Sequence, residues 1–509
     1  MIYNVRMSTT AKILLTTLNA RYMHSAFGLR YLYANLGEQQ SAAELIEFTI
    51  QEQPLSIAEK LLSYQPEVIG FSVYIWNVSE IEAVVGLLKS IKPEIRIILG
   101  GPEVSHSPDL PKLCDLADYV IAGPGEQDFR ELCEKLLQGE HPQTKYIDGR
   151  ATPLEQLVLP YLFYNDEDIR NRLIYVEASR GCPFKCEFCL SALDKTATAF
   201  PLDAFLTEID QLWQRGVRNF KFIDRTFNLK ITTSIAILEF FLERMSDDLY
   251  LHFEVVPDNL PDKLKSVLQK FPPNSLQFEI GIQTFDSEIQ ERISRKQNND
   301  KSKDNIRWLR EHSGAHLHTD LIFGLPGDTL ENFADSFDQL IALNPHEIQV
   351  GILKRLRGAP LNRHNEPSDL RFNPLPPYNL LSSREINFAT MQRVNRFARY
   401  WDLIGNSGRF INTLPLLLDE QPFWHFMTLS DQIYQRTGQT AKIALKRLFE
   451  LIYVVLTEDM HHPAELVKDH LRLDYARAGL KGQPDYEALP TLNKPAKLGT
   501  ANKRQRFHA

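Results

Sequence analysis

Short apolar runs alternate with amphipathic stretches along most of this 509-residue chain. The apolar runs of the first part are residues 12–18, 43–50, 67–73, 95–100 and 118–123. Helix-like stretches such as 78–91 and 126–137 separate them. Strands that alternate with helices pair in parallel through right-handed crossovers. The sequence therefore predicts an N-terminal doubly wound, Rossmann-like α/β domain over residues 10–140, with ligands bound beyond the carboxyl ends of its strands.

A second alternation follows a proline-containing stretch, residues 141–171, that we interpret as a linker. Its strand candidates are residues 173–179, 218–224, 249–255, 275–282, 316–324 and 347–353. Six such units predict a partial (β/α)6 barrel over residues 172–365, with the working residues at the carboxyl ends of the strands. Residues 375–480 predict a mostly helical C-terminal domain, and the proline-containing tail 481–509 is expected to be disordered.

Composition limits the classes of protein that remain. No apolar run approaches the ~20 residues that cross a bilayer, and the start of the chain lacks a signal-peptide core. We therefore expect a soluble, cytoplasmic protein without a membrane partner. A formal charge of −8 and a pI near 6.0 argue against a general nucleic-acid-binding surface.

The cysteines indicate a metal centre. The chain has only five, too few and too unevenly spaced for a disulfide framework. Cys182, Cys186 and Cys189 directly follow the first strand of the barrel, and three thiolates at this CxxxCxxC spacing can hold three irons of a 4Fe–4S cluster and leave the fourth iron open. Structural zinc normally has a fourth Cys or His nearby, and electron-transfer clusters use four Cys. Three structural cysteines or a zinc site is the alternative interpretation, and Cys114 and Cys133 are expected in ordinary cores.

The cysteine motif, with Phe188 before its last member, resembles that of the radical S-adenosylmethionine (radical SAM) superfamily. The resemblance implies that Cys182, Cys186 and Cys189 ligate the cluster and that the open iron chelates the methionine amine and carboxylate of SAM. It also implies reductive cleavage of SAM to a 5′-deoxyadenosyl radical, with Phe188 beside the adenine.

Four polar residues at later strand ends extend the resemblance. Glu254, Gln283, Arg295 and Asp320 are similar to the series in coproporphyrinogen oxidases and methylthiotransferases that contacts the methionyl group and ribose of SAM. The residue types fit: Glu accepts from an ammonium, Arg pairs with a carboxylate, and Gln and Asp suit hydroxyls. Each residue taken alone is equally consistent with an ordinary polar strand end. Arg225 departs from the family, since it replaces the second acid of an FxDDxFN-type segment.

The first domain resembles the cobalamin-binding domain of the cobalamin-dependent subfamily. Residues 100–105 look like its GGPHxS stretch and residues 122–126 like its GxGE stretch. The loop after the first strand departs from the DxHxxG motif, because His24 stands four residues before Gly28 and Tyr22 occupies the Asp position. A cobalt ligand, a polar contact and a structural role all stay open for His24, and a domain that no longer binds cobalamin is the alternative. The contacts that the resemblance implies are Ser72, Gly100, Gly101, Gly123, Glu126 and His24.

The two modules together suggest a cobalamin-dependent radical SAM enzyme that transfers methyl to an unactivated carbon. A cobalamin-assisted rearrangement or cyclisation without methyl transfer, and a non-catalytic iron–sulfur or cobalamin sensor, are the alternatives. Methylthiolation would need a second cluster, for which only Cys114 and Cys133 are available. The resemblance implies a small-molecule or peptide substrate and reduced flavodoxin or ferredoxin as electron donor. The C-terminal segment resembles a helical domain of unknown function attached to one group of these proteins.

Overall fold

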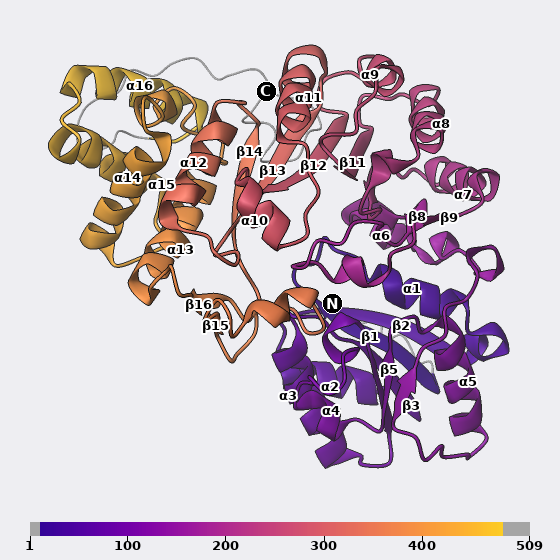
Figure 1. Ribbon diagram of the computed structural model, residues 1–509. Helices are drawn as coiled ribbons and strands as arrows, with labels where there is room; N and C mark the ends of the chain where they lie inside the picture. Colours follow the sequence, from indigo (N-terminus) through magenta and orange to yellow (C-terminus); the bar gives the residue numbers. More distant parts are fainter. Residues whose placement is uncertain (1–10, 482–509) are drawn as a thin grey trace.

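The computed structural model describes residues 11–481, which form two α/β parts and a helical part (Figure 1). The predicted disordered tail lies, apart from Lys481, outside the described residues. In the described part of the chain, no helix is both long and apolar enough to cross a membrane.

The first part contains a parallel sheet with strand order β2-β1-β3-β4-β5-β6. Its strands are β1 (Ile13–Asn19), β2 (Ala43–Thr49), β3 (Val68–Ser72), β4 (Arg96–Gly100), β5 (Tyr119–Ala122) and β6 (Tyr146–Asp148). Side chains on one face pack against α2 (Pro54–Leu62) and α3 (Val78–Ile91), and those on the other face pack against α1 (Phe27–Ala34) and α5 (Glu126–Leu137). Burial on both faces explains the almost continuous apolar strands. The predicted doubly wound domain is confirmed, with the switch in strand order between β1 and β3.

The sixth strand differs from the expectation for residues 141–171. Both β6 and α6 (Asp166–Asn171) lie in the stretch interpreted as a linker. The β6 strand is short and its side chains are mostly exposed, so its sequence lacks an apolar run that would reveal it. The domain limits themselves stay predictions.

The second sheet is an open, all-parallel barrel wall with strand order β14-β13-β12-β11-β10-β7. Its strands are β7 (Ile174–Val176), β10 (Asn219–Phe222), β11 (Tyr250–Val255), β12 (Leu276–Gln283), β13 (His316–Phe323) and β14 (Glu347–Ile352). The helices that cover its outer face include α7 (Leu202–Gln214), α8 (Ile231–Leu242), α9 (Asp262–Leu268), α10 (Ser287–Arg292), α11 (Asn299–His312) and α12 (Leu330–Ile341). Along β12, buried apolar residues alternate with half-buried polar ones. The apolar residues face the helices, which leaves a polar inner face.

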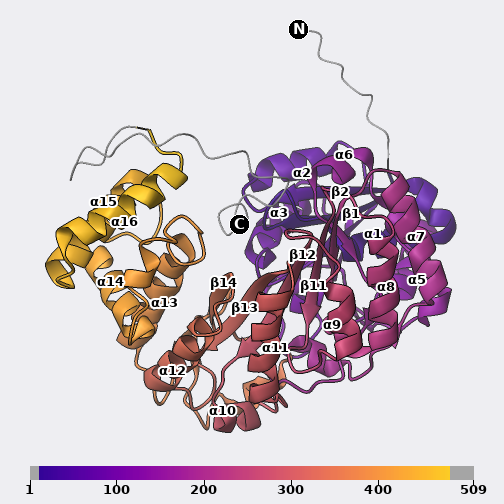
Figure 2. The same cartoon turned by 90° about the horizontal axis from the view of Figure 1, so that it is seen from above.

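The C-terminal part contains α13 (Phe388–Leu403), α14 (Pro422–Thr437), α15 (Leu445–Val454) and α16 (Ala464–Arg477). These helices lie beside α12, at the opposite end of the barrel wall from α7 and α8 (Figures 1 and 2). Phe337 of α12 contacts Phe397, Trp401 and Phe423 through edge-to-face ring pairs. The helical part therefore shares a hydrophobic core with the barrel, as aromatic pairs of this kind stabilise beyond the area they bury.

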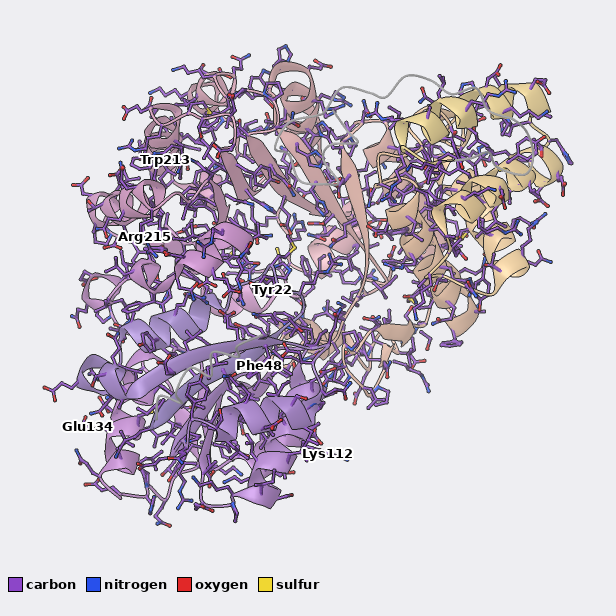
Figure 3. All side chains as sticks on the ribbon, turned by 180° about the vertical axis from the view of Figure 1, so that it is seen from behind. Tyr22, Phe48, Lys112, Glu134, Trp213 and Arg215 are labelled. Atoms are coloured by element: carbon purple, nitrogen blue, oxygen red, sulfur yellow. The ribbon has the colours of Figure 1, made fainter. Side chains whose placement is uncertain are left out.

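The N-terminal domain is fixed to α6, the helix that directly precedes the barrel, partly through charged groups. Arg30 of α1 is buried between Glu47 of β2 at 2.7 Å and Asp168 of α6 at 2.8 Å. Tyr22, labelled in Figure 3, lies at this junction, where it donates to Glu167 at 2.5 Å. Paired and buried charges of this kind specify one docking geometry, because an unpaired partner would be strongly destabilising.

Candidate cofactor sites

The three clustered cysteines lie on a loop that directly follows the short strand β8 (Ser179–Arg180). Gly181 has φ +89°, and a Cβ atom there would lie 2.4 Å from the carbonyl oxygen of Thr196, so only glycine fits this turn. The backbone N–H of Cys182 then donates to the carbonyl of Asp194 at 3.1 Å. The turn therefore fixes where the motif begins.

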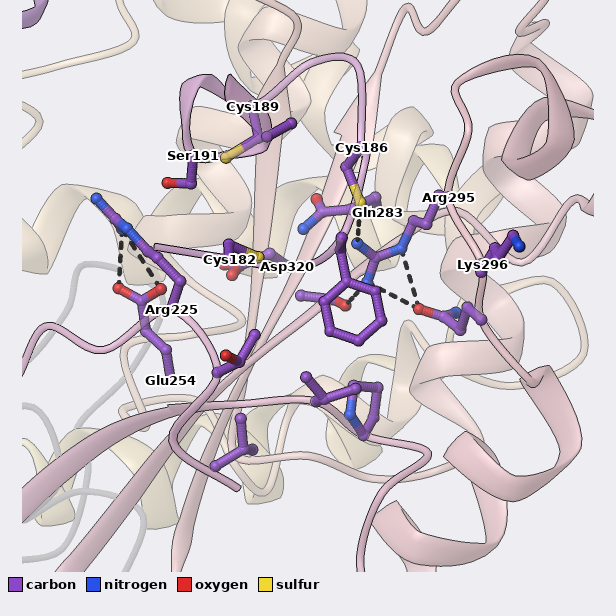
Figure 4. A pocket seen from close by; sticks show the side chains of 18 of the residues that line it. Cys182, Cys186, Cys189, Ser191, Arg225, Glu254, Gln283, Arg295, Lys296 and Asp320 are labelled. Carbon is purple, nitrogen blue, oxygen red and sulfur yellow. Dashed lines mark hydrogen bonds and ion pairs between the residues drawn. The ribbon is translucent and has the colours of Figure 1, made fainter. Parts of the chain in front are cut away.

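Cys182, Cys186 and Cys189 line one cavity of about 190 Å³ (Figure 4). Burial raises the pKa of the Cys182 and Cys186 thiols, while the nearby Arg295 guanidinium opposes this rise at Cys186. The Nη1 atom of Arg295 lies 3.6 Å from Cys186 Sγ. Three thiols on one cavity wall, with a cation that favours the thiolate form, fit an iron–sulfur cluster, since metal ligation requires thiolates.

All five residues predicted to contact SAM line this same cavity: Phe188, Glu254, Gln283, Arg295 and Asp320. Their assignments as SAM contacts stay predictions. Gln283 ends β12 with φ +68°, and its buried Oε1 atom has no hydrogen-bond partner among residues 11–481. Because buried polar atoms are normally satisfied, this acceptor indicates a missing ligand.

Two of these side chains, Glu254 and Arg295, already have partners within the protein, whereas the sequence predicted them as direct contacts of SAM. Glu254 pairs with Arg225 Nη1 at 3.1 Å, so the residue that departs from the family motif neutralises the expected ammonium acceptor. Arg295 also donates to the carbonyl of Gly281 and, through Nη2 at 2.8 Å, to Gln297 Oε1. Figure 4 shows both arrangements at the cavity wall.

The inner face of the barrel below the cavity carries alternating charges. Glu279 Oε2 lies 3.0 Å from His252 Nε2 and 3.4 Å from Lys221 Nζ. Burial acts to raise the pKa of Glu279, but the hydrogen bond from His252 and the charge of Lys221 hold it below its ordinary value. For His318, burial acts to lower the pKa, but hydrogen bonds to Asp320 and Glu347 raise it to about 10. The cavity floor is therefore a network of paired charges.

His318 makes the stability of the protein pH-dependent. Its pKa is raised from 6.5 to about 10 on folding, so its stabilising contribution is complete below pH 6.5 and is lost as the pH rises toward 10. The loss follows a slope of up to about 1.4 kcal/mol per pH unit. We expect the free energy of unfolding to fall between pH 7 and 10 by clearly less in His318→Asn than in the wild type, measured by urea denaturation. His312→Asn, at an exposed site on α11, should follow the wild type, and equal slopes for all three proteins would contradict the assignment.

A second cavity, of about 260 Å³, lies at the carboxyl ends of the first sheet. A Cβ atom added to Gly123 would meet no atom within 4 Å, and one at Gly28 or Gly100 would make only ordinary van der Waals contacts. Side chains there would fill the cavity, so the glycines keep room for a bulky group, as a cobalamin tail requires. The predicted cobalamin contacts that line it are Ser72, Gly100, Gly101, Gly123 and Glu126.

A third cavity, of about 550 Å³, lies between the domain and the barrel. His24 lines it, with Nδ1 2.7 Å from the hydroxyl oxygen of Tyr175, and burial lowers the pKa of His24. Its role toward cobalt stays a prediction. Tyr74 and Trp76 also line the cavity, stacked with ring centroids 4.3 Å apart. Because the Trp76 side chain is 44% exposed, its ring offers an apolar surface on which a flat ligand could stack.

Sequence reasoning missed several residues that line these cavities. Lys221 of β10 lines the large cavity and gave no signal of its own; Arg225, beyond the end of β10, also lines it but was identified only as a departure from the family segment. Tyr74 and Trp76 come directly after the end of β3, and two aromatic residues at the carboxyl end of a predicted strand were the available sequence signal. Arg180 gave no signal, because its partners come from both domains: Glu126 Oε1 at 2.7 Å and Glu177 Oε1 at 2.9 Å. The predicted cobalamin contact Glu126 thus also joins the domain to the cluster loop.

Comparisons with known proteins match each part of the chain separately. The B12 binding domain model matches residues 13–133, the radical SAM superfamily model matches residues 176–340, and a model for a protein family of unknown function, DUF4080, matches residues 368–497. The solved structure of the radical SAM methyltransferase TsrM from Kitasatospora setae has a TM-score of 0.56 at 18% identity, over 69% of this chain and 74% of that one. That likeness supports the fold.

Two curated relatives are methyltransferases. The cobalamin-dependent radical SAM methyltransferase TokK of Streptomyces tokunonensis is 26% identical, over 66% of this chain and 54% of the relative. The 2-(S-pantetheinyl)-carbapenam-3-carboxylate methyltransferase of Streptantibioticus cattleyicolor is 25% identical, over 58% and 48%. The chain thus spans about half the length of these relatives. The radical SAM and B12 binding domain matches imply a 4Fe–4S cluster, SAM and cobalamin as cofactors. Taken together, the three matches have the domain order of radical SAM proteins that carry an N-terminal B12 binding domain and a C-terminal domain of unknown function.

Proposed function

We propose that this protein is a cobalamin-dependent radical SAM enzyme that transfers a methyl group to an unactivated carbon. The observation that carries the proposal is that the large cavity between the domains has lining residues in common with each of the other two cavities. Arg225 and Glu254 line both the cluster cavity and the large cavity between the domains. Tyr74 and Arg180 line both the glycine-rich cavity and that same large cavity. A substrate in the large cavity would therefore lie between the two cofactors.

The residues have distinct tasks in this proposal. Cys182, Cys186 and Cys189 would hold the cluster, and Phe188 and Gln283 would orient SAM on it. When bound, the cluster supplies the electron that cleaves SAM to a 5′-deoxyadenosyl radical, and the corrin carries the methyl group to the substrate carbon.

The substrate and the electron donor follow from family likeness. Both named relatives are methyltransferases, which favours methyl transfer over rearrangement. A cavity of about 550 Å³ suits a small molecule or a short peptide side chain. Reduced flavodoxin or ferredoxin is the proposed electron donor.

Anaerobic incubation of the reconstituted protein with SAM, hydroxocobalamin and dithionite tests this function. Methyl donation converts SAM to S-adenosylhomocysteine, whereas reductive cleavage yields 5′-deoxyadenosine, and mass spectrometry separates the two products. We expect both. Only 5′-deoxyadenosine would favour a rearrangement or cyclisation, and neither product would favour a sensor.

A further inference from the structure

The chain that follows β14 contacts residues that flank both cofactor cavities. Residues 355–364, here called the strap, run from the last barrel strand to the N-terminal domain and then to the cluster loop. Figure 1 shows this orange part of the chain reaching the N-terminal domain. A single short segment therefore contacts a loop beside each cofactor cavity, and the two loops belong to different domains.

At its first end the strap is held by the N-terminal domain. Arg357 Nε donates to Glu103 Oε1 at 2.8 Å, and its Nη1 donates to Asp109. Glu103 is 4% exposed and directly follows the glycine turn of the cobalamin cavity, where the family's GGPHxS stretch has histidine. Gly358 has φ +75°, and a Cβ atom there would lie 2.2 Å from His106 Nδ1. A buried ion pair and a glycine-only contact thus fix this end.

At its second end the strap is held by the cluster loop. Glu187, between the second and third cysteines, is 5% exposed. Its carboxylate accepts hydrogen bonds from Arg363 Nη2 at 2.7 Å and Ser294 Oγ at 2.6 Å, and it lies 2.9 Å from His364 Nε2. The backbone N–H of Leu361 donates to the Glu187 carbonyl at 2.9 Å. The cluster loop therefore depends on the strap for most partners of its one buried carboxylate.

The strap is braced internally between its two ends. Asn362 Nδ2 donates to the carbonyl of Leu356 at 3.1 Å, and the N–H of Ala359 donates to the same carbonyl at 3.2 Å. Leu361 is 2% exposed and packs in the barrel core. Ala359 and Leu361 are the buried residues of this short, internally hydrogen-bonded segment, and they anchor it between its two ends, so a shift at one end displaces the other.

We propose that the strap couples the two cofactor sites by positioning the cluster loop relative to the cobalamin-binding loops. Occupancy of one site then changes the affinity of the other, and by linkage the effect is reciprocal. The inference rests on the two cofactors of the proposed function and does not depend on methyl transfer.

Two binding measurements without SAM or substrate test the coupling. The first is the Kd of hydroxocobalamin by absorbance titration, for protein with and without a reconstituted cluster. The second is the rate of iron release to a chelator, with and without hydroxocobalamin. We expect the cluster to tighten hydroxocobalamin binding about fivefold or more, and hydroxocobalamin to slow iron release, since couplings between sites are commonly 5–150-fold.

Variants at each end show whether the strap carries the effect. Arg363→Met removes the ion pair at the cluster end, and the nearly isosteric Glu103→Gln removes the charge of one of the two acids that hold Arg357 at the domain end. Both variants should move the two ratios toward one. Arg371→Met, which removes an exposed ion pair with Asp369 beyond the strap, should keep the wild-type ratios. Thermal unfolding checks that each variant folds.

Three results would count against the strap. Binding of both cofactors with a hydroxocobalamin Kd that the cluster does not change, or ratios that Arg363→Met and Glu103→Gln leave unchanged, would overturn this inference alone. A protein that binds no hydroxocobalamin would overturn it together with the proposed function.

Discussion

Replacing Cys186 with alanine is expected to remove the cluster and end SAM cleavage. A cluster of this kind contains about four irons and has three thiolate ligands in this motif. Loss of an outer partner of a metal ligand already costs about 10–100-fold in affinity or activity, so loss of a ligand should cost more than about 100-fold. Iron per chain after anaerobic reconstitution and 5′-deoxyadenosine formation by mass spectrometry are the two measurements.

Cys133→Ala is the matched control, since it removes a thiol of the same chain outside the motif. Cys133 lies on α5 and is fully buried in the core of the first domain. We expect unchanged iron and unchanged 5′-deoxyadenosine, with a stability loss of about 1 kcal/mol from the small cavity. A Cys186→Ala protein that keeps its iron and its activity would show that the motif binds no cluster.

Much of the fold could be predicted because its signals are local. The run 275–282 becomes β12 at Leu276–Gln283, and the helix expected at 78–91 is α3 with the same bounds. Because both faces of the first sheet are buried, its strands are continuous apolar runs, and such runs can be recognised directly in the sequence. The cysteine loop could be predicted for the same reason, since its three predicted ligands lie within eight residues.

The parts that could not be predicted depend on how distant segments meet. Alternation along β12 shows that Gln277 and Glu279 share one face, but it does not show whether that face is solvent or a barrel interior. The pair between Glu103 and Arg357 joins residues 254 positions apart, and neither local sequence indicates the other. The contacts that join the two cofactor sites arise only after the domains dock.

Arg180→Met is expected to destabilise the protein by about 3–5 kcal/mol at pH 7. Arg180 lies between Glu126 and Glu177, which are 7% and 6% exposed, and its guanidinium carbon lies 4.4 Å from the ring centre of Tyr31. Methionine fills much of the same volume but leaves two buried carboxylates without their counter-ion, the situation in which breaking a buried pair is costly. Urea denaturation of the two proteins measures the difference.

The pH dependence of that difference separates lost charge pairing from lost packing. Burial already raises the pKa of Glu177 in the wild type, and removal of Arg180 raises it further. Protonation then relieves the unpaired charge, so the gap between Arg180→Met and the wild type should shrink as the pH falls from 8 to 5. Arg307→Met, which breaks an exposed pair with Asp304 on α11, should change stability by less than about 1 kcal/mol at every pH. A gap for Arg180→Met that stays constant with pH would assign the loss to packing around Tyr31, and the two carboxylates would then not depend on Arg180 for their charge.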